Sequence, residues 1–86
     1  KIEMNFDILR IDGVKAKTGI ARSTIYLRIE QGLLPKPFSI GGNSVGWLLD
    51  EIVKINAART AGCSDHEITE LVKKIELERK TFKEIF

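Results

Sequence analysis

The sequence predicts a mainly α-helical fold with a small β-hairpin wing, that is, a winged helix-turn-helix of about four helices. Three observations lead to this prediction. Two short helical segments meet across a tight glycine-led turn within residues 12–32. Two short runs of alternating apolar residues then flank a glycine-rich tip within residues 36–47, and two further helical segments complete the chain.

The length and composition indicate a single folded domain over residues 1–86. The chain is 43% apolar and 30% charged, which is typical of a globular protein and not of a disordered segment. No apolar run approaches the roughly 18 residues needed to span a bilayer, and no signal-peptide pattern opens the sequence. We therefore expect a cytoplasmic protein that has no membrane partner.

Capping residues and glycines set the limits of the first two helices. Asp12 is expected to cap a short helix over residues 13–18, which Gly19 ends in a left-handed conformation. After a three-residue turn, a second helix is expected over residues 23–31, and Gly32 terminates it. Two short helices across such a turn have the geometry of a helix-turn-helix.

A β-hairpin is expected directly after the second helix. Two prolines favour an extended path, and apolar residues then alternate on both sides of the glycine-rich tip. We expect Phe38 and Trp47 to pack into the core and to fix this wing to the helices. A base-stacking role is the alternative for Trp47.

The hairpin is followed by a predicted third helix over residues 49–61. Asp50 and Glu51 fall in its first turn, where the helix dipole favours acidic side chains.

At the N-terminus of the chain, residues 1–10 are expected to form an irregular or extended lead-in.

The fourth helix, over residues 64–80, has the clearest start in the chain. Ser64 and Glu67 have the spacing of a capping box, in which each side chain accepts the other's backbone N–H. An apolar stripe at i, i+3, i+4 and i+7 follows, formed by Ile68, Leu71, Val72 and Ile75. This stripe is expected to pack on the third helix. The alternative is a docking surface for a partner or a second copy of the chain, which residues 81–86 could extend.

Catalytic and metal-binding patterns are missing from the sequence. Cys63 and His66 are the only cysteine and histidine, so an internal disulfide is impossible and a zinc site lacks ligands. The sequence has no glycine-rich phosphate loop after a strand and no oriented base for a nucleophile. We therefore expect a non-enzymatic protein without cofactor, metal ion or small-molecule ligand.

Positive charge concentrates around the helix-turn-helix. Residues 1–47 carry seven Lys or Arg against four Asp or Glu, whereas residues 48–86 carry seven against eight. Within residues 15–36 only Glu30 opposes five cations, which are Lys15, Lys17, Arg22, Arg28 and Lys36. This distribution favours a polyanionic partner, and an ordinary polar surface is the alternative.

The second helix has the side chains of a DNA recognition helix. At about 100° per residue, Ile25 and Ile29 share one face, which must be the buried one. The opposite face carries Arg22, Ser23, Tyr26, Leu27 and Glu30. Arginine can bind guanine O6 and N7 as a fork, while hydroxyls reach phosphates and base edges. We therefore expect this helix to read the major groove of double-stranded DNA.

Several of these residues also have a purely structural interpretation. Thr24 can simply begin the helix, and Tyr26 can be partly core. Arg28 lies beside the buried face, so it is either a flanking phosphate contact or a long side chain lying over apolar neighbours. At the wing tip, Asn43 and Ser44 fit against a sugar-phosphate backbone or minor groove, but the tip lacks a cation and can be a simple turn.

The chain resembles the AlpA family of phage and prophage regulators. The resemblance covers about residues 9–80. It rests on the ordered motifs STIY, QGLLPKP, VGW and AARTAG, with a capped last helix after them. The winged helix-turn-helix of this family is similar to that of MerR-type regulators and phage excisionases.

The resemblance implies a DNA-binding regulator of a mobile element. Such a protein controls transcription of integrase or host genes, or directs recombination toward excision by bending attachment-site DNA. Its implied partners are double-stranded DNA, further copies of itself as a dimer or cooperative array, and a phage-type integrase. It would be located at the nucleoid in the cytoplasm. The family's DNA-binding positions fall on Arg22, Ser23, Thr24 and Tyr26 in the helix and on Gly42, Asn43 and Ser44 in the wing.

This sequence departs from the family's pattern at three positions. Ala21 stands where a capping serine is common, so the second helix is expected to begin at Ser23 or to lose about 1 kcal/mol of capping. Asn43 stands where arginine is often found, and Cys63 where lysine is common. Both of these departures lower the positive charge of the surface.

Overall fold

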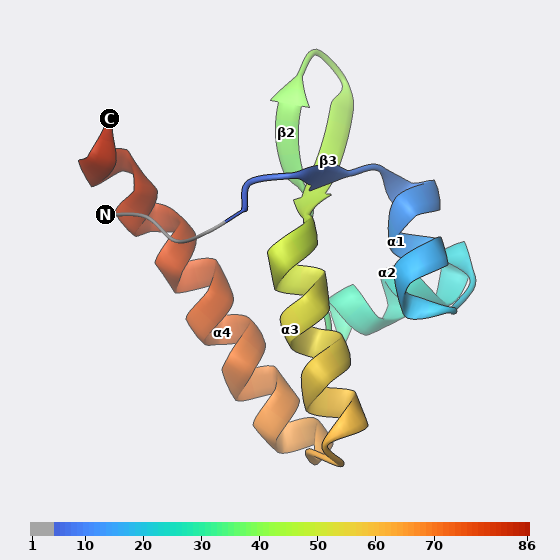
Figure 1. Cartoon of the computed structure of the whole chain (residues 1–86). Coiled ribbons are helices and arrows are strands. Elements are labelled where there is room, and N and C mark those ends of the chain that lie inside the picture. Colours follow the sequence, from blue (N-terminus) through green and yellow to red (C-terminus); the bar gives the residue numbers. More distant parts are fainter. Residues whose placement is uncertain (1–4) are drawn as a thin grey trace.

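A computed structural model of the chain describes residues 5–86, in which four α-helices lie below and beside a small antiparallel sheet whose hairpin projects beyond them (Figure 1). The first four residues of the predicted lead-in lie outside the described part. The elements in chain order are β1 (Ile8–Leu9), α1 (Ile11–Thr18), α2 (Arg22–Glu30), β2 (Phe38–Gly41), β3 (Ser44–Leu48), α3 (Leu49–Thr60), α4 (Asp65–Thr81) and the 3-10 helix η1 (Phe82–Ile85). This arrangement confirms the predicted fold class, mainly α with a hairpin wing.

The sheet has the strand order β1-β3-β2, with both pairings antiparallel. Strands β2 and β3 form the predicted wing, whose register pairs Phe38 with Gly46. The expected extended lead-in contains a short third strand, β1, in which Ile8 pairs with Leu48. Gly46 makes room for this strand, because a Cβ atom there would lie 2.5 Å from Ile8 Cγ2.

The prediction that Asp12 caps the first helix is wrong. Helix α1 begins earlier, at Ile11, with extended Arg10 at its N-cap and no side-chain cap. Ile11 packs against the core, so burial holds the helix start without a cap. Asp12 therefore lies inside the first turn, where it faces the positive end of the helix dipole. The helix ends as predicted at Gly19, whose φ is 73°.

Helix α2 begins at Arg22, one residue earlier than expected. Ala21 is its N-cap and gives no side-chain hydrogen bond, so the start of this helix lacks the usual polar cap. At the other end Gly32 adopts a φ of 78°, and the N–H of Leu33 donates to the carbonyl of Arg28 at 2.7 Å. This left-handed stop turns the chain sharply toward the wing.

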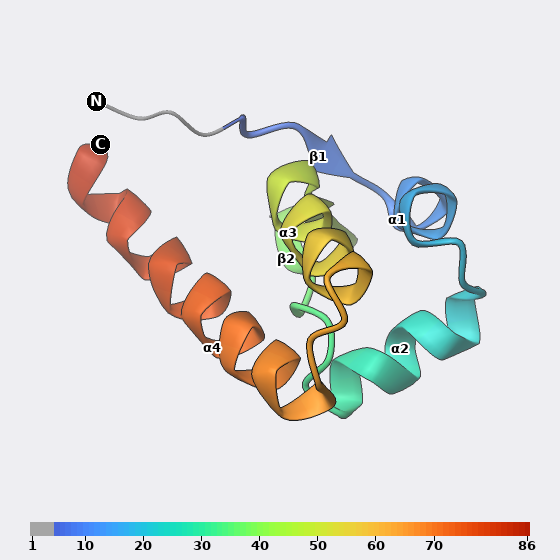
Figure 2. The same ribbon diagram turned by 60° about the horizontal axis from the view of Figure 1, so that its bottom comes forward.

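Helices α3 and α4 run in opposite directions and are closest near the turn that joins them, and α3 lies between α4 on one side and α1 and α2 on the other (Figure 2). Their facing residues, together with the helix-turn-helix and the base of the wing, form one core. The buried apolar residues of this core are Val14, Ile25, Leu33, Leu34, Trp47, Ile52, Ile55, Ile68, Val72 and Ile75. The apolar stripe of α4 thus packs on the chain's own interior, with Leu71 only half-buried at its edge.

Glu51 lies in the first turn of α3 as expected, but its main interaction there is an ion pair and not only the helix dipole. It is 2% exposed, and its carboxylate accepts hydrogen bonds from Arg79 Nε at 3.0 Å and Nη2 at 2.6 Å. The same guanidinium lies 5.2 Å from the ring centroid of Phe38. Glu51 is therefore half of an ion pair that joins α3, α4 and the base of the wing. Asp50 is half-buried and accepts the N–H of Asn5 at 2.9 Å.

The predicted capping box at the start of α4 is confirmed. Ser64 Oγ accepts the N–H of Glu67 at 3.2 Å, and Glu67 Oε1 accepts the N–H of Ser64 at 2.8 Å. The hydrogen bond from the Ser64 backbone, followed by the one with its side chain, holds the pKa of Glu67 below its ordinary value of 4.5. The carboxylate form of Glu67 is therefore part of the helix start.

Candidate nucleic-acid interface

Helix α2 divides into a buried and an exposed face as its sequence predicts. Ile25 is fully buried and Ile29 packs against the core, so the helix is anchored by one side. Arg22 and Ser23 are exposed, and 52% of Leu27 is accessible. The N-terminal turn of α2 therefore presents a guanidinium and a hydroxyl to solvent, beside backbone N–H groups that have no partner within the helix.

Tyr26 connects this exposed face to the wing. Its ring packs edge-on against Trp47, with 6.4 Å between the centroids, yet 39% of the residue is exposed. The guanidinium carbon of Arg22 lies 5.7 Å from the Tyr26 centroid, within cation–π distance. Both interpretations of Tyr26 therefore hold, since it is partly packed and still accessible.

Trp47 belongs to the core, as expected. It is 1% exposed, and its Nε1–H donates to the carbonyl of Pro35 at 3.1 Å. The start of α2 is thus joined to a buried residue at the wing base through contacts of Arg22 with Tyr26 and of Tyr26 with Trp47. Sequence reasoning missed this contact because 21 positions separate the two aromatic residues, although they are the only Tyr and Trp in the chain.

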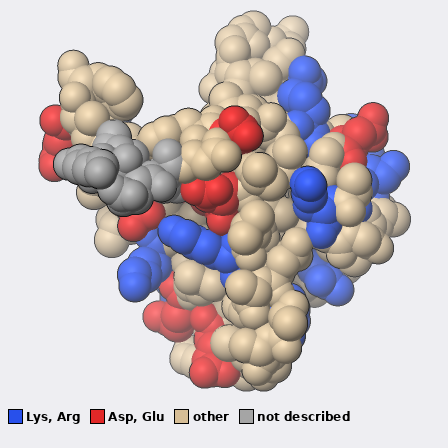
Figure 3. Space-filling view, in the orientation of Figure 1, with Lys and Arg blue, Asp and Glu red and all other residues tan. Residues whose placement is uncertain are grey.

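The wing itself carries no charged side chain. The strands β2 and β3 contain neither acid nor base, and the top of the hairpin is uncharged in Figure 3. Gly41 and Gly42 have φ values of 112° and 56°, which allow the tight turn at the tip. Asn43 is exposed there and Ser44 is half-buried. The wing can thus offer an amide and a hydroxyl to a ligand, but no cation.

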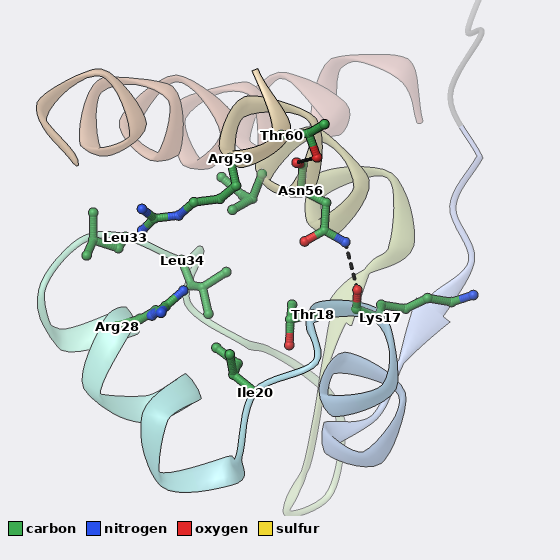
Figure 4. Close-up of a pocket in the computed structure, with 10 residues that line it drawn as sticks. Lys17, Thr18, Ile20, Arg28, Leu33, Leu34, Asn56, Arg59 and Thr60 are labelled. Atoms are coloured by element: carbon green, nitrogen blue, oxygen red, sulfur yellow. Dashed lines mark hydrogen bonds between the residues drawn. The ribbon is translucent and has the colours of Figure 1, made fainter. Parts of the chain in front are cut away.

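The structure separates the predicted phosphate-binding cations into two groups. Lys15, Lys17 and Lys36 are exposed on α1 and on the segment after α2. Lys15 Nζ has one weak neighbour, Asp12 Oδ1 at 4.0 Å. Arg28 is half-buried, and its side chain turns into a pocket between α2 and α3 (Figure 4). Thr24 is half-buried on the same side of the helix.

Four of the seven cations of residues 48–86 form ion pairs with acids, and red and blue side chains alternate over α3 and α4 in Figure 3. The ion pairs here are Lys54–Glu78 at 3.7 Å, Arg59–Asp65 at 3.0 Å, Lys73–Glu70 at 3.2 Å and Arg79–Glu51 at 2.6 Å. Within residues 5–47 the structure gives only the weak pair of Lys15 with Asp12. The excess positive charge therefore lies on the helix-turn-helix side of the molecule.

In the described part of the chain, no group of three or more metal-ligating side chains comes together. No helix within residues 5–86 is long and apolar enough to cross a membrane.

Comparison with known proteins shows which family the chain belongs to. Residues 7–59, more than half of the chain, match the model of the family described as prophage CP4-57 regulatory protein (AlpA). The chain therefore belongs to the AlpA family. The match runs from β1 to the penultimate residue of α3, so the AlpA region includes the helix-turn-helix and the wing.

A relative of this AlpA-family chain comes from Enterobacteria phage P4. It is described as uncharacterized protein ORF88 and is 43% identical over 54 residues. The aligned region covers 63% of this chain and 61% of that protein, so the similarity spans less than two thirds of either. No solved structure matches the chain.

Proposed function

We propose that this AlpA-family protein is a non-enzymatic, sequence-specific DNA-binding regulator of a prophage or another mobile element. The observation that carries the proposal is the division of α2, which buries Ile25 and exposes Arg22, Ser23 and Tyr26 beside a hairpin wing. A helix anchored in this way can enter the major groove, which is wide enough for it. The protein would act at the nucleoid in the cytoplasm.

The residues of α2 have different roles in this proposal. Arg22 reads guanine through O6 and N7, because its guanidinium is a planar fork. Ser23 and Tyr26 reach phosphates or base edges from the same turn, and Thr24 lies at the flank of the contact. The free amides at the start of α2 favour a phosphate there, because no acidic side chain lies in the first turn.

Three exposed lysines and the wing complete the proposed interface. Lys15, Lys17 and Lys36 neutralise phosphates around the reading helix, whereas Arg28 turns into the pocket between α2 and α3. Asn43 and Ser44 approach the sugar-phosphate backbone from the wing tip. Because the wing has no cation, most of the electrostatic attraction comes from the helix-turn-helix.

Membership of a phage regulatory family supports a role as a transcriptional regulator, as a recombination directionality factor, or as both. One module of this kind covers only about 600–1,000 Å² of protein surface on DNA. Useful affinity therefore requires a dimer or several copies on adjacent sites, and a directionality factor would also contact a phage-type integrase. Strong bending in circular-permutation gels would favour the excision role.

The alternative function is a protein-interaction module that would bind a partner through the apolar stripe of the fourth helix, and most of that stripe is buried. Ile68, Val72 and Ile75 are buried in the core and are not available to a partner.

The experiment that tests the proposal is selection of a binding site from a random DNA pool, followed by mobility-shift titration at several salt concentrations. If about five phosphates are neutralised, log K falls with log[salt] at a slope near −4.5. Failure to enrich any sequence, together with a flat salt response, would reject DNA binding as the function.

A further inference from the structure

A second candidate site lies away from the DNA-reading face, between the helix-turn-helix and α3. It is a pocket of about 450 Å³, shown in Figure 4. Its walls come from Thr18 at the end of α1, Arg28 on α2, Leu34 after α2, and Asn56 and Arg59 on α3. At about 100° per residue, Arg28 points roughly 140° around α2 from Ser23, so this pocket and the reading face are separate surfaces.

Two guanidinium groups reach into the same side of this pocket, from two different helices (Figure 4). Arg59 Nη1 donates to Asp65 Oδ1 at 3.0 Å, but its Nε is buried and has no hydrogen-bond partner among residues 5–86. Arg28 forms no ion pair within the same described range. Asp65 pairs with Arg59 from outside the pocket, and no Asp or Glu lines the pocket, so its walls offer no acid to Arg28.

The rest of the lining is apolar or already satisfied. Leu33, Leu34 and Ile55 are buried and exclude water from the floor. Asn56 Nδ2 donates to the carbonyl of Lys17 at 2.8 Å, whereas the ammonium of Lys17 points away from the pocket in Figure 4. An anion placed between these two guanidinium groups gains charge-assisted hydrogen bonds from both, including the buried Nε–H of Arg59 that has no partner among residues 5–86.

We infer that this pocket binds a small organic anion, whose carboxylate or phosphate oxygens bridge Arg28 and Arg59. The volume is within the range of pockets that enclose small molecules, about 300–1,000 Å³. A short apolar body of the ligand packs on Leu34 and Ile55. Because Arg28 belongs to α2 and Arg59 to α3, the bound anion fastens the helix that carries Arg22 to the rest of the core. This inference goes beyond the proposed function and does not need DNA.

The test is an NMR titration of the whole chain with inorganic phosphate and, separately, with citrate, with chloride keeping the ionic strength constant. The arginine Nε–H signals report directly on the groups involved. We expect saturable shifts of the Arg28 and Arg59 signals, while the exposed Arg10 signal stays constant. Shifts that are absent, or equal for all arginines, would overturn the inference, because they indicate no site or only general screening.

Variants make the result specific to the pocket. Arg28→Gln and Arg59→Gln are each expected to weaken phosphate or citrate binding about tenfold, since each removes one of two charge-assisted contacts. Arg10→Gln is the matched control, and the dispersion of each backbone spectrum shows whether the variant is folded. If Arg59→Gln is unfolded, Arg28→Gln alone decides, and unchanged binding in that variant would overturn the inference.

A final arm separates a small anion from a DNA phosphate. Adding a saturating duplex to the phosphate-loaded protein is expected to leave the Arg28 and Arg59 signals in their bound positions. Displacement of the probe by the duplex would show that the pocket belongs to the DNA contact and would overturn the inference. Because the titration itself contains no DNA, a negative result would leave the proposed DNA binding untouched, and failure of DNA binding would leave the pocket result valid.

Discussion

Arg22 occupies the first turn of α2 and lies over the ring of Tyr26, so its guanidinium is held close to the start of the helix. We predict that Arg22→Ala weakens binding to the selected DNA site by about 1–3 kcal/mol, because a bidentate contact to one base is lost. Binding to random duplex should fall much less. Mobility-shift titrations on both DNAs measure the difference. Equal losses on the two DNAs would reduce Arg22 to a phosphate contact, for which Lys17→Ala is the reference.

The Glu51–Arg79 pair gives a second prediction at the residue scale. Glu51 is 2% exposed and receives its hydrogen bonds from a single guanidinium. Replacing Arg79 by Met should therefore lower the free energy of unfolding by about 3–5 kcal/mol, since a buried carboxylate is left without its partner. The double variant with Glu51→Leu should regain much of this loss. Urea denaturation of the three proteins tests the coupling.

A double variant no more stable than Arg79→Met would contradict this account. Such a result would mean that Arg79 acts mainly through packing on Phe38 and not through the ion pair.

Residue-scale predictions from the sequence succeeded where the cause was local. The buried position of Ile25 follows from helical spacing alone, and the exposure of Arg22 and Ser23 follows from the same geometry. The burial of Glu51 could not be predicted in this way, because its partner is 28 positions away. An acid in the first turn of a helix is ordinarily explained by the dipole, so no sequence signal indicated the pair.

At the scale of an element, the prediction concerns the N-terminal cap of α4. Hydrogen bonds with Ser64 lower the pKa of Glu67 in the folded protein. Glu67 therefore stabilises the fold fully above its ordinary pKa of 4.5, and this contribution is lost as the pH falls through the lowered folded value. We predict that Glu67→Gln flattens this acidic part of the stability curve. Urea denaturation from pH 7 to about pH 3 measures it.

Ser64→Ala serves as the companion variant for the cap. At neutral pH it should lower the free energy of unfolding by about 1 kcal/mol, as is usual for loss of an N-cap side chain. Curves for wild type and Glu67→Gln that run parallel throughout the acidic range would show that the cap does not depend on ionised Glu67.

Helix ends that a glycine or a capping residue marks could be predicted from the sequence, whereas elements that depend on contacts distant in sequence could not. Gly19 and the capping box each mark a helix end through the backbone groups next to them. The strand β1 was anticipated only as an extended lead-in, since it has two residues and exists through its pairing with β3. Asp12 failed as a cap for the same reason, because contact of Ile11 with the core moves the start of α1.

The whole molecule is electrostatically divided, and this division yields the broadest prediction. Residues 1–47 carry a net charge of +3 and residues 48–86 a net charge of −1. A cation that lies next to a carboxylate is already partly neutralised, so it adds little to the attraction of DNA. An exposed lysine near the reading helix, by contrast, can neutralise one DNA phosphate. Lys17 is of the second kind, and Lys54, which lies 3.7 Å from Glu78, is of the first. Lys36 also has a carboxylate close by, because its backbone N–H donates to Glu76 Oε2 at 2.9 Å.

We therefore predict that Lys17→Gln makes the slope of log K against log[salt] shallower by about 0.9, while Lys54→Gln leaves it unchanged. Both substitutions remove the same formal charge, so net charge alone predicts the same effect for the two of them. Mobility-shift titrations with the selected duplex at four salt concentrations distinguish the two accounts. Equal changes in slope would mean that the duplex responds to the total charge of the molecule, and the proposed interface would then have to be placed elsewhere. A change confined to Lys17 would locate a phosphate contact on the helix-turn-helix.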